Sequence, residues 1–173
     1  SRGGESMEEN FINFVDLAKQ LGVYEAKIIQ TYTIHTAEWV RLKCQYGCDG
    51  FQAGLCCPPF TPTPLETRKI LDDYQKALLI HCQPGSGVTE IIRKLEREIF
   101  LSGFYKAFGF GAGSCDLCDE CSVEKCLYPN EARPSMEACG IDVYATAWNN
   151  GFFIEVLKDY SCKGNYYGLV LID

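Results

Sequence analysis

Four cysteines lie within twelve residues of this chain, in the run Cys115-Asp-Leu-Cys118-Asp-Glu-Cys121-Ser-Val-Glu-Lys-Cys126. This C-x2-C-x2-C-x4-C spacing constrains the fold, because the two-residue gaps let consecutive sulfur atoms converge on one centre. Three thiolates spaced in this way are typical of iron–sulfur clusters. Zinc sites more often use two C-x2-C pairs separated by a longer loop, with histidine available. We therefore expect these four cysteines to bind a [4Fe–4S] cluster, with zinc as the alternative.

The cysteine spacing departs from that of bacterial ferredoxins in one respect. In that pattern three residues separate the third cysteine from the fourth, and proline follows at once. Here four residues separate Cys121 from Cys126, and Pro129 comes three positions later. The sequence leaves open whether Cys126 completes this cluster or reaches another. Gly111 and Gly113 precede the run and would let the backbone approach a cluster closely.

A second group of cysteines follows the pattern Cys44-x3-Cys48-x7-Cys56-Cys57 and is followed by two prolines. We interpret residues 44–64 as a loop, and a loop of this length inside a compact domain is unusual unless it is functional. Side chains of adjacent residues diverge, so we expect one of the two neighbouring cysteines to be a ligand and the other to pack. We favour Cys57 as the ligand, because the proline after it holds its backbone extended.

The fourth ligand of such a second site stays open. Cys139, Cys126 or a non-protein group could supply it, and an open iron corner would permit Lewis-acid or sulfur-transfer chemistry. The alternative is a rigid loop with buried thiols, because free cysteines pack as small hydrophobic residues. Cys82 ends an apolar run and is expected in the core. His35 and His81 lie apart from the cysteine run, which leaves any site mostly sulfur-ligated.

The totals of charge and cysteine restrict the class of protein. The chain has 173 residues and a formal net charge of −7, which argues against nucleic-acid or anionic-membrane binding. Such a charge suits a protein that docks on a basic redox partner protein. No apolar run approaches the roughly 20 residues that a membrane span needs. Eleven cysteines, an odd number, without a visible signal peptide lead us to expect reduced thiols and a cytoplasmic location.

Strand and helix patterns alternate along the chain and predict a single α+β domain. Residues 1–6 look like a cloning remnant, so we expect the domain to span residues 7–173. A β-α-β unit over residues 76–110 predicts a mixed sheet with packed helices and cysteine-rich loops that bind the cluster, with an α/β fold as the alternative. Helical patterns cover residues 8–21, 64–74, 88–101 and 135–149, and strand patterns cover residues 26–34, 39–43, 76–82, 104–110, 152–157 and 166–172.

Four segments carry a resemblance to a known family: Lys43-Cys-Gln-Tyr-Gly-Cys48, Leu55-Cys-Cys-Pro-Pro59, Gly111-Ala-Gly-Ser-Cys-Asp-Leu-Cys-Asp-Glu-Cys121 and Ala132-Arg-Pro-Ser-Met-Glu-Ala-Cys-Gly-Ile-Asp-Val143. In this order they resemble a family of predicted metal-binding proteins from anaerobic archaea and bacteria. The resemblance implies metal binding through cysteine and no particular reaction. The positions that match the family's cysteines are Cys44, Cys48, Cys57, Cys115, Cys118, Cys121 and Cys126, with Cys139 as a further candidate.

The cysteine patterns support three functional hypotheses. In the first, the protein carries one or two [4Fe–4S] clusters for electron transfer or for redox activation of a partner. In the second, it is an iron–sulfur enzyme with an open cluster corner, used in sulfur transfer or redox chemistry. In the third, it is a zinc-stabilised interaction module that unfolds on chelation. The number of thiolates at the second site separates the first two hypotheses, and the identity of the metal separates both from the third.

Overall fold

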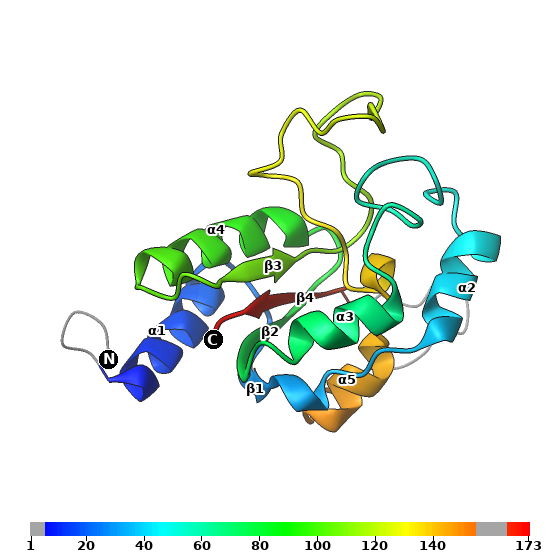
Figure 1. Cartoon of the computed structure of the whole chain (residues 1–173). Coiled ribbons are helices and arrows are strands. Elements are labelled where there is room, and N and C mark those ends of the chain that lie inside the picture. Colours follow the sequence, from blue (N-terminus) through cyan, green and yellow to red (C-terminus); the bar gives the residue numbers. More distant parts are fainter. Residues whose placement is uncertain (1–5, 155–165) are drawn as a thin grey trace.

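A four-stranded sheet forms the centre of the protein in this computed structural model, which describes residues 6–154 and 166–173 (Figure 1). The strands are β1 (Glu25–Gln30), β2 (Lys76–Cys82), β3 (Phe108–Phe110) and β4 (Tyr166–Leu171), in the order β1-β2-β4-β3. All neighbouring pairs run antiparallel. β2 and β3 therefore point the same way with β4 between them, which splits the expected β-α-β unit. The α+β class is confirmed, whereas the sheet is antiparallel and not mixed.

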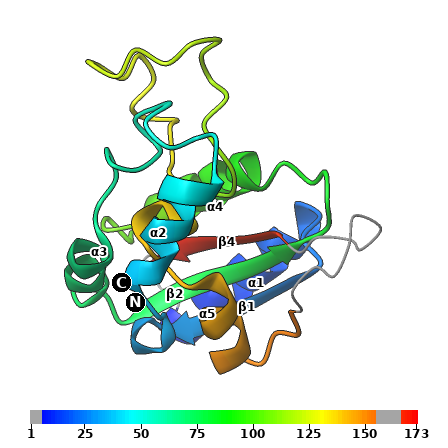
Figure 2. The ribbon, with the colours of Figure 1, turned by 90° about the vertical axis from the view of Figure 1, so that its right-hand side faces the viewer.

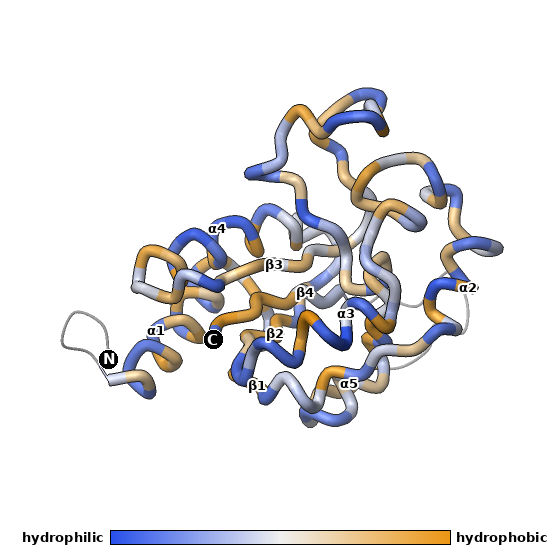
Figure 3. The backbone as a smooth tube through the Cα atoms, viewed as in Figure 1, coloured by the Kyte–Doolittle hydropathy of each residue, from blue (hydrophilic) through white to orange (hydrophobic). Residues whose placement is uncertain are grey.

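Helices cover both faces of the sheet and enclose two hydrophobic cores. α1 (Met7–Gln20) and α4 (Val88–Leu101) form one core with Leu78 and Ile80 of β2. α3 (Pro64–Leu71) and α5 (Val143–Asn149) contribute to the core on the other face, with Ala77 and Leu79. β2 thus alternates between two apolar layers, which explains the continuous apolar run in its sequence. Figure 3 shows how hydrophobic segments gather in the sheet between the helices.

Local capping signals set the starts of two helices. α3 begins after Thr63, whose hydroxyl accepts a hydrogen bond from the Glu66 N–H at 3.1 Å, as the sequence pattern predicts. α1 begins in the same way after Ser6, which forms a capping box with Glu9. Ser6 therefore takes part in the fold, although it falls within the segment interpreted as a cloning remnant; residues 1–5 lie outside the described residues.

The predicted strand over residues 39–43 is wrong, because this segment belongs to helix α2 (Glu38–Gly47). Its aromatic and β-branched residues indicated a strand. In the structure Val40 is buried, while Trp39, Leu42 and Tyr46 are exposed. α2 packs on the turn that precedes α5, so a tertiary contact overrides the local preference.

Gly140 interrupts the single helix predicted over residues 135–149. Glu137–Cys139 form a short 3-10 turn, and α5 starts only after Asp142, whose carboxylate caps it. Gly140 has a φ of +79°, and a Cβ there would lie 2.4 Å from Cγ of Pro64. Both the left-handed backbone and the close approach of α3 require glycine at this position.

Two strands are shorter than predicted. β1 ends at Gln30, opposite the first residue of β2, and Thr31–Thr33 then form a 3-10 turn. β3 begins at Phe108, opposite the last residue of β4. Neither strand extends past the end of the strand that it pairs with, because a strand needs a partner for its backbone hydrogen bonds. Of the strand predicted over residues 152–157, residues 152–154 belong to no strand and residues 155–157 lie outside the described residues.

Two long loops without helix or strand project from the same side of the molecule. We call residues 48–63 the first cysteine loop and residues 111–135 the second cysteine loop. They lie side by side in both views of the ribbon (Figures 1 and 2). A Cβ on Gly54 of the first loop would lie 3.4 Å from Cβ of Cys121 in the second. The two cysteine groups of the sequence therefore meet in space.

Candidate metal centre

The first cysteine loop is tied to the rest of the protein at its end. Nη2 of Arg41, on α2, donates to the carbonyls of Thr61 and Pro62 at 2.9 and 3.2 Å. The Thr61 hydroxyl in turn donates to the carbonyl of Ala138. These contacts hold the end of the loop against α2 and against the 3-10 turn at residues 137–139.

The second cysteine loop is closed at its base. The Gly111 N–H donates to the Pro134 carbonyl at 2.9 Å, which joins the two ends of the loop. The guanidinium of Arg133 donates to the carboxylate of Glu96, on α4, at 2.6 and 2.7 Å. The two side chains are only 11% and 15% exposed. α4 therefore anchors the loop next to the sheet.

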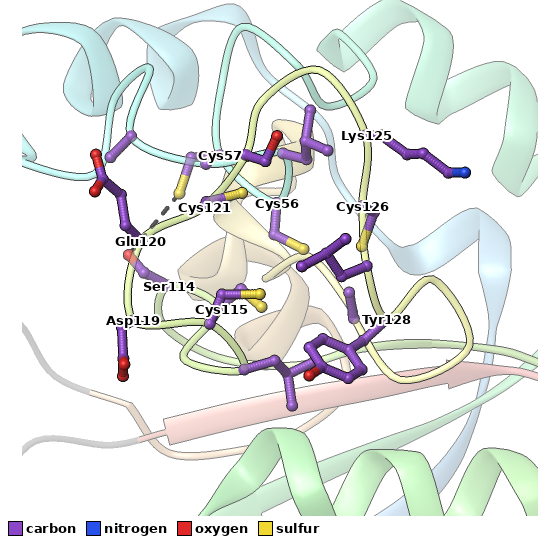
Figure 4. A pocket seen from close by; sticks show the side chains of 18 residues that line it. Cys56, Cys57, Ser114, Cys115, Asp119, Glu120, Cys121, Lys125, Cys126 and Tyr128 are labelled. Atoms are coloured by element: carbon purple, nitrogen blue, oxygen red, sulfur yellow. Dashed lines mark hydrogen bonds between the residues drawn. The ribbon is translucent and has the colours of Figure 1, made fainter.

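A cavity of about 230 Å³ lies between the two cysteine loops. Figure 4 shows the sulfur atoms of Cys56, Cys115 and Cys126 directed toward the space between the loops. The thiol of Cys57 points instead to Ser114, with its sulfur 3.8 Å from the hydroxyl oxygen. The structure thus brings the whole C-x2-C-x2-C-x4-C motif to one cavity. The cysteines that line this first cavity are Cys56, Cys57, Cys115, Cys118, Cys121 and Cys126.

Burial and neighbouring thiols raise the pKa of two cysteines in the first cavity. Burial raises the pKa of Cys56 to about 12, and a hydrogen bond with Cys115 and the charges of nearby thiols add to the rise. Burial and the charges of neighbouring cysteines, Cys121 first among them, also raise the pKa of Cys118. Thiolates this close together repel one another. A bound cation would remove that repulsion, so metal binding and thiol deprotonation are coupled here.

Cys56 is the cavity residue that the sequence interpretation missed. That interpretation assigned packing to Cys56 and ligation to Cys57, on the ground that adjacent side chains diverge. Both lie in a turn rather than in an extended strand, and both reach the first cavity. The only signal in the sequence was the unusual pair of adjacent cysteines within a loop.

A second cavity, of about 320 Å³, lies beside the first and is lined by Cys44, Cys48 and Cys57. Cys44 is in α2 and Cys48 follows the last residue of that helix. Cys48 thus comes about one helical turn after Cys44, and both cysteines reach the same cavity. Cys57 lines both cavities and connects the two groups.

Other predicted ligands lie elsewhere. Cys139 is fully buried in the core beneath α3 and α5, where burial raises its pKa to about 12. Cys139 lines neither the first nor the second cavity. Cys126 lines the first cavity and not the second. Cys82 is buried in the other core, as predicted. Cys162 lies outside the described residues.

The histidines do not join the cysteines. The ring of His81, on β2, stacks on Tyr167 with centroids 4.6 Å apart. The backbone N–H of His35 donates to the Thr146 hydroxyl at 3.1 Å. Among the described residues, neither the first nor the second cavity is lined by histidine. Both cavities therefore offer sulfur as the main donor.

The donor set fits a thiophilic metal, but the coordination is not preassembled. Within residues 6–154 and 166–173, no group of three or more His, Cys, Asp or Glu side chains is arranged to hold a metal ion as it stands. Thiolate-rich sites select zinc, copper(I) or iron–sulfur clusters. The cysteines sit on loops made of turns. Metal binding would therefore draw the sulfur atoms inward from their present positions around the cavity.

Comparison with known proteins supports the metal-binding interpretation. The sequence profile of a family described as "Predicted metal-binding protein (DUF2284)" matches residues 27–172. No curated protein and no solved structure matches the chain. The matched range covers the sheet except the first two residues of β1, and it includes both cysteine loops and both cavities. Within the described residues, none of the helices has the length and apolarity required to cross a membrane.

Proposed function

This chain belongs to the DUF2284 family of predicted metal-binding proteins, and we propose that the metal is a [4Fe–4S] cluster held in the first cavity. The observation that carries the proposal is the convergence of six cysteines on one cavity that has room for more than a single ion. The ligands would be Cys115, Cys118, Cys121 and Cys126, whose spacing suits such a cluster. When bound, the cluster would supply one-electron redox chemistry.

Cys56 would act beside the cluster rather than as a ligand. The four motif cysteines already supply the four ligands of the cluster, and Cys56 hydrogen-bonds with one of them, Cys115. An S–H that donates to a ligating sulfur stabilises the reduced, more negative cluster and raises its reduction potential. Cys56 would therefore tune the centre while the four motif cysteines hold it.

Electron transfer to a partner protein suits the position of this cavity. Cys115 is exposed, and the other three motif cysteines are half-buried, so a partner can approach the centre closely. Leu127 and Tyr128 line the cavity and are also exposed, which offers an apolar contact surface beside it. Acidic residues of the same loop favour a basic redox partner: Asp116, Asp119, Glu120 and Glu124.

The test is metal analysis of protein purified without oxygen. We expect iron and sulfide in the native protein, with an EPR signal after reduction. The Cys118→Ser, Cys121→Ser double variant should contain one cluster per chain less than the native protein. Cys82→Ala is the matched control, because Cys82 is buried in the core under α1 and α4 and should leave the iron content unchanged.

Zinc is the outcome that would overturn the cluster assignment. Zinc can occupy thiolate sites that have lost iron, so the analysis must precede any exposure to air. A colourless protein that holds zinc without sulfide when kept anaerobic would identify a zinc-stabilised module instead. Iron that persists unchanged in the double variant would contradict the placement of the cluster in the first cavity.

A further inference from the structure

Three thiols outside the proposed ligand set gather around the second cavity. Cys44 and Cys48 come from the end of α2, and Cys57 comes from the first cysteine loop. Cys48 is exposed, Cys44 half-buried and Cys57 buried. Cys44 and Cys48 also line a further cavity of about 270 Å³, whose other walls include residues 141–144. Solvent and small molecules can therefore approach this group of thiols.

Gly50 keeps a space clear between two of these sulfur atoms. A Cβ on Gly50 would lie 3.4 Å from Sγ of Cys48, 3.3 Å from Sγ of Cys57 and 3.0 Å from Oγ of Ser114. Both sulfur atoms thus face the same point, which no side chain occupies because residue 50 is glycine. A bound ion or cluster edge would find its donors around this point.

Hydrogen bonds around the three thiols suit thiolate ligands. The Gly50 N–H donates to Sγ of Cys48 at 3.4 Å, and the thiol of Cys57 donates to the Ser114 hydroxyl, with the sulfur and oxygen 3.8 Å apart. A backbone N–H that donates to sulfur typically orients a metal-bound thiolate and offsets its charge, and the Ser114 hydroxyl could donate to Cys57 once that thiol is deprotonated. A cation bound among these three thiols would stabilise them as thiolates.

We propose that Cys44, Cys48 and Cys57 bind a second thiophilic metal centre whose remaining coordination position is open to the second cavity. Among the described residues that line this cavity, these are the three cysteines, and Glu137 carries the one carboxylate. Neither Cys139 nor Cys126 lines it, so a fourth thiolate does not close the site. The open position would take a small exogenous ligand with a soft donor, such as a thiol.

The proposed second centre uses none of the four cysteines that we propose as cluster ligands, although Cys57 lines both cavities. It is therefore tested in the Cys118→Ser, Cys121→Ser background, with Co²⁺ added to reduced, metal-free protein under anaerobic conditions. We expect one Co²⁺ per chain with thiolate-to-metal charge-transfer absorption. Adding Cys48→Ser should weaken Co²⁺ binding by at least about tenfold. Cys48 is exposed, so this change removes a donor without disturbing the core.

Gly50→Ala tests the geometry without removing any donor. In the same background it should weaken Co²⁺ binding by about tenfold, because the new methyl group fills the space between the two sulfurs. Gly47→Ala is the matched control, since a Cβ there meets no atom within 4 Å. Circular dichroism and urea midpoints establish that each variant is folded. Unchanged binding in the folded Gly50→Ala variant would overturn the proposed arrangement.

Two further outcomes test whether the second centre exists and whether its remaining coordination position is open. If the Cys118→Ser, Cys121→Ser background binds no Co²⁺ while it remains folded, the second centre does not exist as an independent site. If 2-mercaptoethanol shifts the charge-transfer bands of the Co²⁺ form, the coordination position is open. Bands that do not respond to the thiol would show a closed site. Failure of the cluster proposal for the first cavity would leave these results unaffected.

Discussion

Removal of the carboxylate from the Glu96–Arg133 pair should loosen the second cysteine loop. Glu96 accepts two hydrogen bonds from the Arg133 guanidinium and one from the Gly109 N–H at 2.6 Å. Arg133 also donates to the carbonyls of Pro129 and Ala132 at 3.2 and 2.7 Å. One ion pair therefore joins α4, β3 and the return of the loop.

The loss of folding stability on Glu96→Gln follows from the burial of both Glu96 and Arg133. Glu96→Gln leaves a guanidinium that is only 11% exposed without its counter-charge. Breaking a buried pair in this way costs about 3 kcal/mol, which would lower Tm by roughly 6–12 °C for a chain of this size. The exposed pair Glu90–Lys94 on the same helix, at 3.6 Å, is the matched control. Glu90→Gln should cost about 0.3 kcal/mol.

Urea unfolding of the reduced, metal-free variants measures these values. A double-mutant cycle with Glu96→Gln and Arg133→Met should give a coupling free energy of about 2 kcal/mol. We also expect the first cavity of the Glu96→Gln variant to bind metal about tenfold more weakly, because the base of its loop is released. If Glu96→Gln costs no more than Glu90→Gln, the pair does not anchor the loop and the reasoning is refuted.

Two further predictions concern the core. A Cβ on Gly168 would lie 2.7 Å from Cγ1 of Ile92 and 3.0 Å from Cγ1 of Val88, so Gly168→Ala should destabilise by roughly 1–3 kcal/mol in urea unfolding, and a neutral effect would contradict this close approach. Burial raises the pKa of Cys82 from 9.0 to about 11, so the folded state holds this proton more tightly than the unfolded state. Its contribution is complete below pH 9 and is lost by about 1.4 kcal/mol per pH unit as the pH rises toward 11. Cys82→Ala should remove that part of the pH dependence of unfolding, and an unchanged slope would contradict it.

The bounds of some helices and strands are determined by the local sequence of the element itself. α4 and β2 have the bounds that the sequence predicts, because a strong amphipathic pattern and a continuous apolar run are local properties. α2 is different, since Val40 is its one buried residue and its packing partner comes from residues 137–139. Strand pairing is also nonlocal: β4 lies between β2 and β3, although it comes last in the chain. Local patterns carry no information on which edge of a strand is free.

The type of donor atom at the candidate site could be predicted from the sequence alone. Cysteine identity and spacing are local, so the run from Cys115 to Cys126 by itself specified sulfur donors presented by one loop. Only the tertiary structure decided which thiols share a cavity. Cys56 joins the first cavity, Cys57 lies between both, and Cys139 is withdrawn into the core. The reason is that loop-to-loop contact depends on anchors such as the Arg133 ion pair, whose partners are far apart in the chain.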